Sequence, residues 1–220
     1  MITIAIDGTG SSGKGTVSKK IAQLLNIHHY DTGAIYRAIG LYCYKNNVDN
    51  NNLAQVEEHL KKINIKVEFI NKEQYTYLNG ECVNNEIRSS IVSDYASRFS
   101  SIKQVREKVI SLQRDFAKYH SVVMEGRDIT TVVLPDAKYK FYLDAPAEIR
   151  AARRLKDLQA KGENITYEQV LADLVERDRR NKEAEHGKLY IAEDATYINT
   201  GNYTPDEIVA IIYSKIDEKN

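Results

Sequence analysis

The residues from Gly8 to Thr16 have the types and spacing needed to bind phosphate. They are Gly8, Thr9, Gly10, Ser11, Ser12, Gly13, Lys14, Gly15 and Thr16. One glycine, four residues and then Gly-Lys is the spacing of a P-loop, in which glycines let successive backbone N–H groups close around phosphate oxygens. In such a loop Lys14 supplies a mobile charge for the β and γ phosphates, and Thr16 offers a hydroxyl to Mg²⁺. We therefore expect this segment to bind a polyphosphate.

The elements around this loop distinguish it from an ordinary glycine-rich turn. The β-branched run from Ile2 to Ile6 is typical of a strand buried on both faces. Apolar residues at helical spacing follow the glycines, so a helix should begin near Lys14 and direct its N-terminal dipole at the phosphates. Strand, loop and helix in this order predict the first unit of a parallel α/β sheet.

Arginines elsewhere in the chain indicate which kind of molecule would accept a phosphoryl group. A P-loop by itself does not separate a switch GTPase, a motor and a small-molecule kinase. Because transfer between two anions depends on positioning and charge neutralisation, an acceptor that already carries phosphate needs arginines on its own side. The candidates are Arg37, Arg88, Arg106 and Arg127. Taken alone, each arginine is better explained as a solvated or ion-paired surface charge, and only its surrounding motif reverses this interpretation.

Several of these motifs resemble those of the bacterial cytidylate kinases, a family of nucleoside-monophosphate kinases. The matching segments are Lys14-Gly15-Thr16, Asp31 to Arg37 (DTGAIYR), Asn85 to Arg88 (NEIR), Gly126-Arg127-Asp128 and Pro135-Asp136-Ala137. The resemblance extends over nearly the whole chain. It implies a kinase that transfers the γ-phosphate of ATP to CMP and dCMP, forming CDP and dCDP, with Mg²⁺ as cofactor. The implied partners are therefore the small molecules ATP and CMP or dCMP.

The same resemblance implies roles for individual residues. The implied catalytic residues are Lys14, Arg37, Arg127, Asp128, Arg177 and Arg180. Arg154 joins the P-loop residues in binding ATP. The implied CMP-binding residues are Thr32, Arg37, Arg88, Ser97, Arg106, Arg127, Asp128 and Arg177.

Within the acceptor site, the resemblance separates contacts to phosphate from contacts to the base. Arg37 and Arg127 would hold the phosphate, whereas Ser97, Arg106 and Asp128 would contact the edge of cytosine. A carboxylate at Asp128 accepts a hydrogen bond from the cytosine amine, while uracil presents a second acceptor at the same place. One alternative that stays open is that Asp128 orients Arg127 and does not contact the base. A separate alternative is that Ser97 is a hydroxyl on a helix surface.

Two arginine clusters are expected in the segment that would close over the site. A helix is predicted from Tyr167 to Lys182, with Arg177 and Arg180 on one face. A second cluster is expected on the preceding helix and comprises Arg150, Arg153 and Arg154. Both clusters are placed to close over a polyphosphate.

The chain departs from the family pattern at several positions. The family lid carries an arginine, an aspartate and a second arginine; Arg177 matches the first, but in a gapless register the other two fall on Asn181 and Ala184. A local shift would put Arg180 or Lys182 in the place of the second arginine. Elsewhere Thr9 stands where the family usually has proline, Thr32 where it has serine, and Thr130 where it has glycine.

Hydrophobic patterning predicts an α/β fold with a central parallel sheet and a small antiparallel β insert. The family resemblance implies, in addition, a P-loop three-layer α/β/α architecture with a helical lid. Alternating apolar residues from Ile63 to Val83 and the turn pair Asn79-Gly80 predict the insert. We expect a core domain at 1–62 and 98–220, which includes a lid at about 150–185, and an acceptor-binding insert at 63–97. Further elements are expected as a helix ending near Tyr119, strands at 121–124, 139–143 and 197–199, and helices at 146–160, 167–182 and from Pro205.

The composition limits the classes of partner. The 220 residues include 31 Lys plus Arg and 31 Asp plus Glu, so no net positive charge draws the protein to nucleic acid or to an anionic membrane. No apolar run approaches the ~20 residues that span a bilayer, and no basic leader precedes Ile2. We expect a cytoplasmic monomer with two reduced, buried cysteines, Cys43 and Cys82.

Other activities remain as alternatives at this point. One is a kinase that prefers UMP, and another is a P-loop kinase for a different small metabolite, such as a shikimate-like acceptor. A GTP-dependent switch should carry the guanine-reading Asn-Lys-x-Asp, which the sequence lacks.

Overall fold

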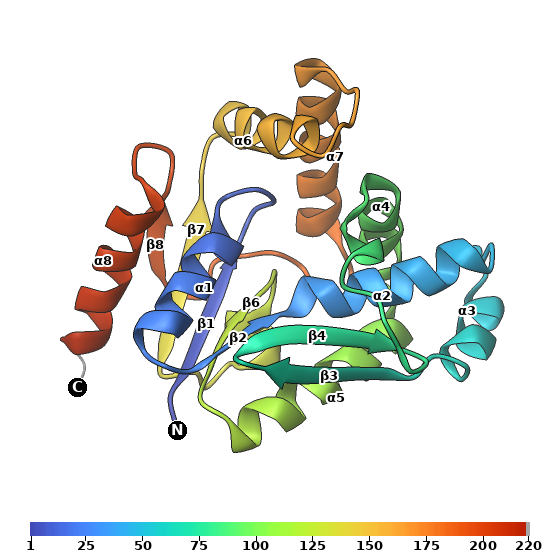
Figure 1. Cartoon of the computed structure of the whole chain (residues 1–220), viewed down its shortest axis with the longest axis horizontal. Helices are drawn as coiled ribbons and strands as arrows, with labels where there is room; N and C mark the ends of the chain where they lie inside the picture. The colour runs from blue at the N-terminus through green and yellow to red at the C-terminus, as the bar shows by residue number, and fades with distance from the viewer. Residues whose placement is uncertain (219–220) are drawn as a thin grey trace.

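The computed structural model of the chain describes residues 1–218 and has a parallel sheet at its centre (Figure 1). Within these residues the strand order is β2 (His28–Asp31), β6 (Val122–Glu125), β1 (Thr3–Gly8), β7 (Tyr139–Asp144) and β8 (Thr196–Asn199). Every neighbouring pair is parallel. The carboxyl ends of the strands therefore meet at one edge, where the P-loop leaves β1.

Side chains of β1 alternate between two hydrophobic clusters, one on each face of the sheet. Ala5 belongs to the cluster formed with helices α2 (Thr32–Lys45) and α5 (Lys103–Tyr119). Ile4 and Ile6 belong to the cluster formed with α1 (Lys14–Leu24) and α8 (Pro205–Asp217). This alternation follows from the two-residue period of a strand. The predicted three-layer α/β/α fold with a central parallel sheet is confirmed.

The predicted antiparallel insert is present as a separate sheet of β3 (Ile65–Ile70), β4 (Glu73–Leu78) and β5 (Glu81–Cys82). Asn79 and Gly80 form the expected two-residue turn, with φ of 50° and 93° between the paired residues Leu78 and Glu81. The Gln74 side chain joins this sheet to the central one, since it accepts from the Asp31 N–H at 2.8 Å.

Two helices of the predicted lid stand above the carboxyl ends of the strands (Figure 1). They are α6 (Ala147–Gln159) and α7 (Tyr167–Glu183), which pack through a small apolar cluster of their own that includes Leu158 and Leu174. Across from α7 lies α4 (Ser90–Phe99), preceded by a short 3₁₀ turn at Glu86–Arg88. The helix and strand predictions after residue 87 are confirmed to within a few residues.

Four elements were not predicted, one of which is the 3₁₀ turn at Glu86–Arg88. β2 has four residues, of which only Tyr30 is apolar, so it shows no buried-strand pattern. Helix α3 (Leu53–Leu60) follows the asparagine-rich loop and is N-capped by Asn52, whose side chain accepts from the Gln55 N–H at 3.1 Å. A π-helical turn at Ile129–Val133 follows β6.

The cysteine expectation is half wrong. Cys43 is buried in α2, but Cys82 is exposed because β5 is a two-residue strand at the end of the insert. Among residues 1–218, no helix has both the length and the apolar character that a bilayer crossing requires.

Candidate active site

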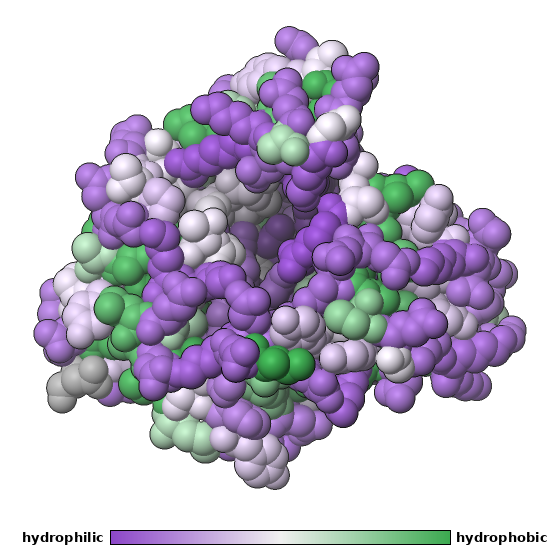
Figure 2. All heavy atoms as spheres, in the orientation of Figure 1, coloured by the Kyte–Doolittle hydropathy of each residue, from purple (hydrophilic) through white to green (hydrophobic). Residues whose placement is uncertain are grey.

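A cavity of about 930 Å³ lies at the carboxyl edge of the sheet. Figure 2 shows it as a hollow lined with hydrophilic residues between the lid helices and the acceptor side. Most of the predicted site residues line it: Ser11, Ser12, Gly13, Lys14, Gly15, Thr16, Thr32, Arg37, Arg88, Ser97, Arg106, Arg127, Asp128, Arg154, Arg177 and Arg180. Residues that are up to 169 positions apart in sequence, Ser11 and Arg180, thus share one space.

The first three P-loop residues do not line the cavity and instead shape the loop. A Cβ at Gly8 would lie 1.8 Å from the Leu143 carbonyl oxygen, so only glycine fits this approach to β7. The Thr9 hydroxyl donates to Asp144 at 2.5 Å. The Gly10 carbonyl accepts from Arg150 at 3.1 Å. These three residues lie outside the cavity lining, and their role in binding ATP stays a prediction.

Lys14 is buried at the first turn of α1, where its Nζ donates to the Thr9 carbonyl at 2.6 Å and to Ser12 Oγ at 3.5 Å. Burial, followed by the charges of Arg127 and Arg177, lowers the pKa of Lys14 well below its usual value. Thr16, two residues further along in the same first turn of α1, is exposed and lines the cavity. A cation and a free hydroxyl thus stand where α1 begins.

Asp31 organises two acceptor-side arginines and was not predicted to do so. It caps α2 by accepting from the Ala34 N–H at 3.0 Å, and its Oδ2 accepts from Arg37 at 2.7 Å and from Arg88 at 3.2 Å. Burial alone would raise the pKa of Asp31, but the charges of Arg37 and Arg88 outweigh it and bring the pKa to about 2. The sequence signal was present, because Asp31 precedes the helix in N-cap position.

The base-reading candidates also meet. Arg106 and Asp128 form a buried ion pair, and Arg106 donates further to the Tyr36 hydroxyl at 3.3 Å. Burial raises the pKa of Asp128, and the charge of Arg106 opposes that rise. Arg127 donates instead to the Gly126 carbonyl at 3.1 Å. The carboxylate of Asp128 is thus bonded to Arg106.

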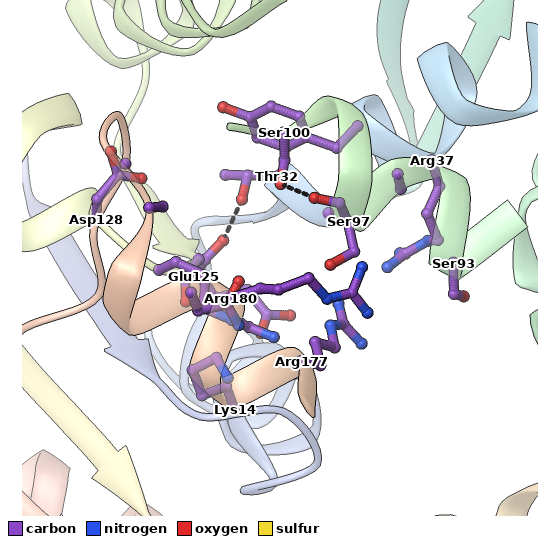
Figure 3. Close-up of a pocket in the computed structure, with 18 of the residues that line it drawn as sticks. Lys14, Thr32, Arg37, Ser93, Ser97, Ser100, Glu125, Asp128, Arg177 and Arg180 are labelled. Carbon is purple, nitrogen blue, oxygen red and sulfur yellow. Dashed lines mark hydrogen bonds between the residues drawn. The ribbon is translucent and has the colours of Figure 1, made fainter. Parts of the chain in front are cut away.

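Two smaller hydroxyl side chains behave differently from each other. The Ser97 Oγ is buried without a hydrogen-bond partner among the described residues and lies in the cavity (Figure 3), which does not fit an exposed helix-surface hydroxyl. Thr32 is 3% exposed, and its hydroxyl donates to the Glu125 carbonyl at 2.6 Å. Ser97 is therefore free for a ligand, whereas Thr32 is already engaged.

Positive charge converges at the middle of the cavity. Figure 3 shows Arg37, Arg177 and Arg180 pointing into the same space. Burial and then the charges of Arg127, Arg37 and Arg154 lower the pKa of Arg177 to about 9. Such a cluster is costly without a counter-charge, so it is suited to bind a polyanion.

Neighbouring cations on the lid helix α7 have different surroundings. Arg180 lies at the cavity with Nη1 3.5 Å from Asp94 of α4 and its buried Nε without a hydrogen-bond partner in residues 1–218. Arg179 is exposed and pairs with Glu176 at 2.9 Å and with Glu183 at 2.5 Å. Lys182 is exposed and does not line the cavity. Arg180 is the one of the three that faces the site.

The arginines of α6 do not form the single cluster that was expected. Arg150 is buried and pairs with Asp178 at 2.7 Å, and Arg153 donates to the Thr200 carbonyl at 2.7 Å. Only Arg154 lines the cavity. Arg150 also donates to the Gly10 carbonyl, so the bonds of Arg150 and Arg153 join α6 to the core.

Glu125 is a site residue that the prediction missed. It ends β6, lines the cavity, and its Oε1 lies 3.2 Å from His29 Nε2. A Cβ at Gly15 would come within 2.9 Å of the same oxygen, so the carboxylate lies against the first turn of α1, next to Thr16. Its position directly before Gly126-Arg127-Asp128, at the end of a predicted strand, was the available signal.

The segment after α7 also lines the cavity, and no feature of the sequence predicted this. Gly187, with φ 74°, lies so close to Arg106 that a Cβ would come within 2.1 Å of Arg106 Nη1. Across residues 1–218, no group of three or more His, Cys, Asp or Glu side chains is arranged to hold a metal ion.

Comparison with known proteins identifies the family. The cytidylate kinase family model matches residues 4–218. A cytidylate kinase of Caldicellulosiruptor saccharolyticus is 44% identical over 94% of this chain and 92% of its own, and one of Thermosipho melanesiensis is 43% identical over 98% and 97%. An uncharacterized protein from Eubacterium ventriosum shares the fold with a TM-score of 0.54 at 15% identity, over 99% of both chains. The chain belongs to the cytidylate kinase family.

Proposed function

We propose that this protein transfers the γ-phosphate of ATP to CMP and dCMP, forming CDP and dCDP. The observation that carries the proposal is a single cavity with a P-loop on one side and, on the other, the arginine pair on Asp31 and the Arg106–Asp128 pair. A polyphosphate donor and a phosphorylated acceptor both find positive charge there, and membership of the cytidylate kinase family specifies the base.

On the donor side, Lys14 and Arg154 would neutralise the phosphates of ATP, with backbone N–H groups of residues 11–16 around them. Mg²⁺ usually binds one or two protein oxygens and completes its shell with phosphate oxygens and water. The Thr16 hydroxyl and the Glu125 carboxylate supply such oxygens, so the residues present fit a phosphate-held Mg²⁺. When bound, the ion supplies further neutralisation of the transferring phosphoryl group.

On the acceptor side, Arg37, Arg88 and Arg127 would hold the phosphate of CMP, because a guanidinium binds phosphate through two parallel hydrogen bonds. Ser97, Arg106 and Asp128 would contact cytosine. Arg177 and Arg180 would complete the charge around the transferring group when the lid closes. We further propose that residues 63–97 act as the acceptor-binding insert and that the protein works as a monomer, which size-exclusion chromatography with light scattering tests.

The proposal is tested by measuring ADP release with ATP, Mg²⁺ and a panel of acceptors: CMP, dCMP, UMP, AMP, GMP and shikimate. CMP and dCMP should be turned over with the highest kcat/KM. A preference for UMP would replace the proposed acceptor, and turnover of shikimate alone would refute nucleotide kinase activity.

Asp128→Asn is predicted to lower kcat/KM for CMP while that for UMP holds or rises. An amide can donate to the uracil carbonyl that a carboxylate repels, and a required hydrogen bond in a buried site discriminates by large factors. Acceptor kinetics for CMP, dCMP and UMP on both proteins measure the ratio. An equal loss for all three would mean that Asp128 acts by orienting Arg106 and does not contact the base.

Arg180→Ala is predicted to reduce kcat by tenfold or more, whereas Arg179→Ala and Lys182→Ala should stay within about twofold of wild type. The physical reason is that only Arg180 faces the cavity with unsaturated donors, while the other two are exposed and exposed charges contribute little. Steady-state kinetics of the three variants decide the lid register. A larger loss in Lys182→Ala would assign the second lid cation to position 182.

A further inference from the structure

Asp7 is a fully buried carboxylate between the P-loop and the acceptor side, and the proposed mechanism does not use it. It precedes Gly8 at the end of β1 and is 0% exposed. Its Oδ1 accepts from the Ile129 N–H at 2.9 Å, and its Oδ2 accepts from the Thr130 N–H at 2.7 Å and from the Thr130 hydroxyl at 2.6 Å. One side chain thus joins residues more than 120 positions apart.

These bonds fix the start of the π-helical turn, which immediately follows Arg127 and Asp128. The Asp128 carbonyl accepts from the N–H groups of Val132 and Val133 at 2.9 and 3.1 Å, so the π-helical turn also holds the backbone of Asp128. Any displacement of Ile129 relative to β1 would move the acceptor loop, Gly126 to Asp128, relative to the P-loop. Transfer is sensitive to small errors in this separation.

Thr130 adds a hydroxyl contact to Asp7. A glycine at this position could supply an N–H but no O–H. Thr130 is 1% exposed, and its hydroxyl is the one side-chain donor that the structure gives to Asp7 in residues 1–218. By contrast, the neighbouring Thr131 has a buried hydroxyl with no partner in the same part of the chain.

The charges around Asp7 come from several elements. Burial raises the pKa of Asp7 to about 6, the three donors from Ile129 and Thr130 oppose the rise, and the charge of Asp128 adds to it. Lys14 of α1, Arg127 and Tyr142 of β7 also face it. Above this pH the carboxylate accepts all three bonds; protonation would turn one acceptor into a donor that faces other donors.

We propose that Asp7 and Thr130 form a positioning clamp that holds the acceptor loop in register with the P-loop, and that the Thr130 hydroxyl extends the working range of the enzyme toward acid pH. The kinetic consequence rests on the proposed CMP kinase function. The clamp itself is a property of the protein without substrate. Neither residue lines the cavity, so both act through Arg127 and Asp128.

The test compares Thr130→Val, Thr130→Ser and the matched control Thr131→Val with wild type. The Asp7 carboxyl is titrated by ¹³C NMR in the substrate-free protein. Because a hydrogen bond to a charged group contributes about one pKa unit, Thr130→Val should raise the pKa of Asp7 by about one unit. Thr130→Ser and Thr131→Val should leave the pKa near that of wild type.

The second measurement is kcat/KM for CMP at saturating ATP. If the pKa of Asp7 is one unit higher, Thr130→Val should retain roughly a third of the wild-type kcat/KM at pH 6.5 and nearly all of it at pH 8.5. Taking the ratio to wild type cancels the ionisation of CMP itself. Thr130→Ser should restore the wild-type ratio at both pH values.

Equal behaviour of Thr130→Val and Thr131→Val in both measurements would overturn the clamp. So would a lower melting temperature of Thr130→Val with an unchanged Asp7 titration, which would indicate packing alone. Absence of CMP turnover in the wild-type protein would instead refute the proposed function, and the Asp7 titration would still decide whether the clamp exists.

Discussion

Lys14→Ala should lower kcat by about a hundredfold or more without lowering the melting temperature. A charge that contacts the developing charge of a transition state contributes factors of this size. The fold should not suffer, because burial and the neighbouring Arg127 and Arg177 already disfavour the charged form of Lys14 in the substrate-free protein. The lost hydrogen bond to the Thr9 carbonyl offsets part of that relief.

The matched control for this variant is Lys19→Ala. Lys19 lies on the same helix but is exposed and pairs with Glu73 at 3.1 Å, away from the cavity. Its replacement should change kcat by less than twofold. Steady-state kinetics and thermal melting of both variants are the measurements, and turnover of Lys14→Ala within about threefold of wild type would remove Lys14 from the mechanism.

Arg177→Ala should lower kcat by about a hundredfold and raise the melting temperature of the substrate-free protein. Burial and three neighbouring arginines lower the pKa of Arg177 to about 9. A cation whose folded-state pKa lies below its unfolded value is destabilising at neutral pH, and the cost fades only as the pH rises through about 9. Alanine removes this cost, together with a charge that stabilises the transferring phosphoryl group.

Thermal melting with and without ADP separates this explanation from a simple packing effect. A bound polyanion provides the counter-charge that the arginines lack, so ADP should raise the melting temperature of wild type by several degrees more than that of Arg177→Ala. Arg179→Ala is the control, because Arg179 on the same helix is exposed and saturated by Glu176 and Glu183. An equal gain from ADP in wild type and Arg177→Ala would show that Arg177 does not bind the phosphates.

Features that depend on neighbours along the chain could be predicted from the sequence. The P-loop could be predicted because its glycines, Lys14 and Thr16 lie within nine residues. The strands at 122–125 and 139–144 and helix α5 could be predicted because burial imposes a period that is visible in a short window. β2 was missed because its four mostly polar residues show no such period.

Which charged side chains face the cavity, and which are saturated elsewhere, depends on contacts that form only when the chain folds. Arg150, Arg153 and Arg154 are indistinguishable in sequence, yet the first pairs with Asp178, the second with Thr200, and only the third lines the cavity. The same holds for the bond of Asp128 to Arg106 and for the contact of Asp7 with Thr130. Each partner is contributed by a distant segment, and the energy of an ion pair or hydrogen bond depends on the distance and burial that folding creates.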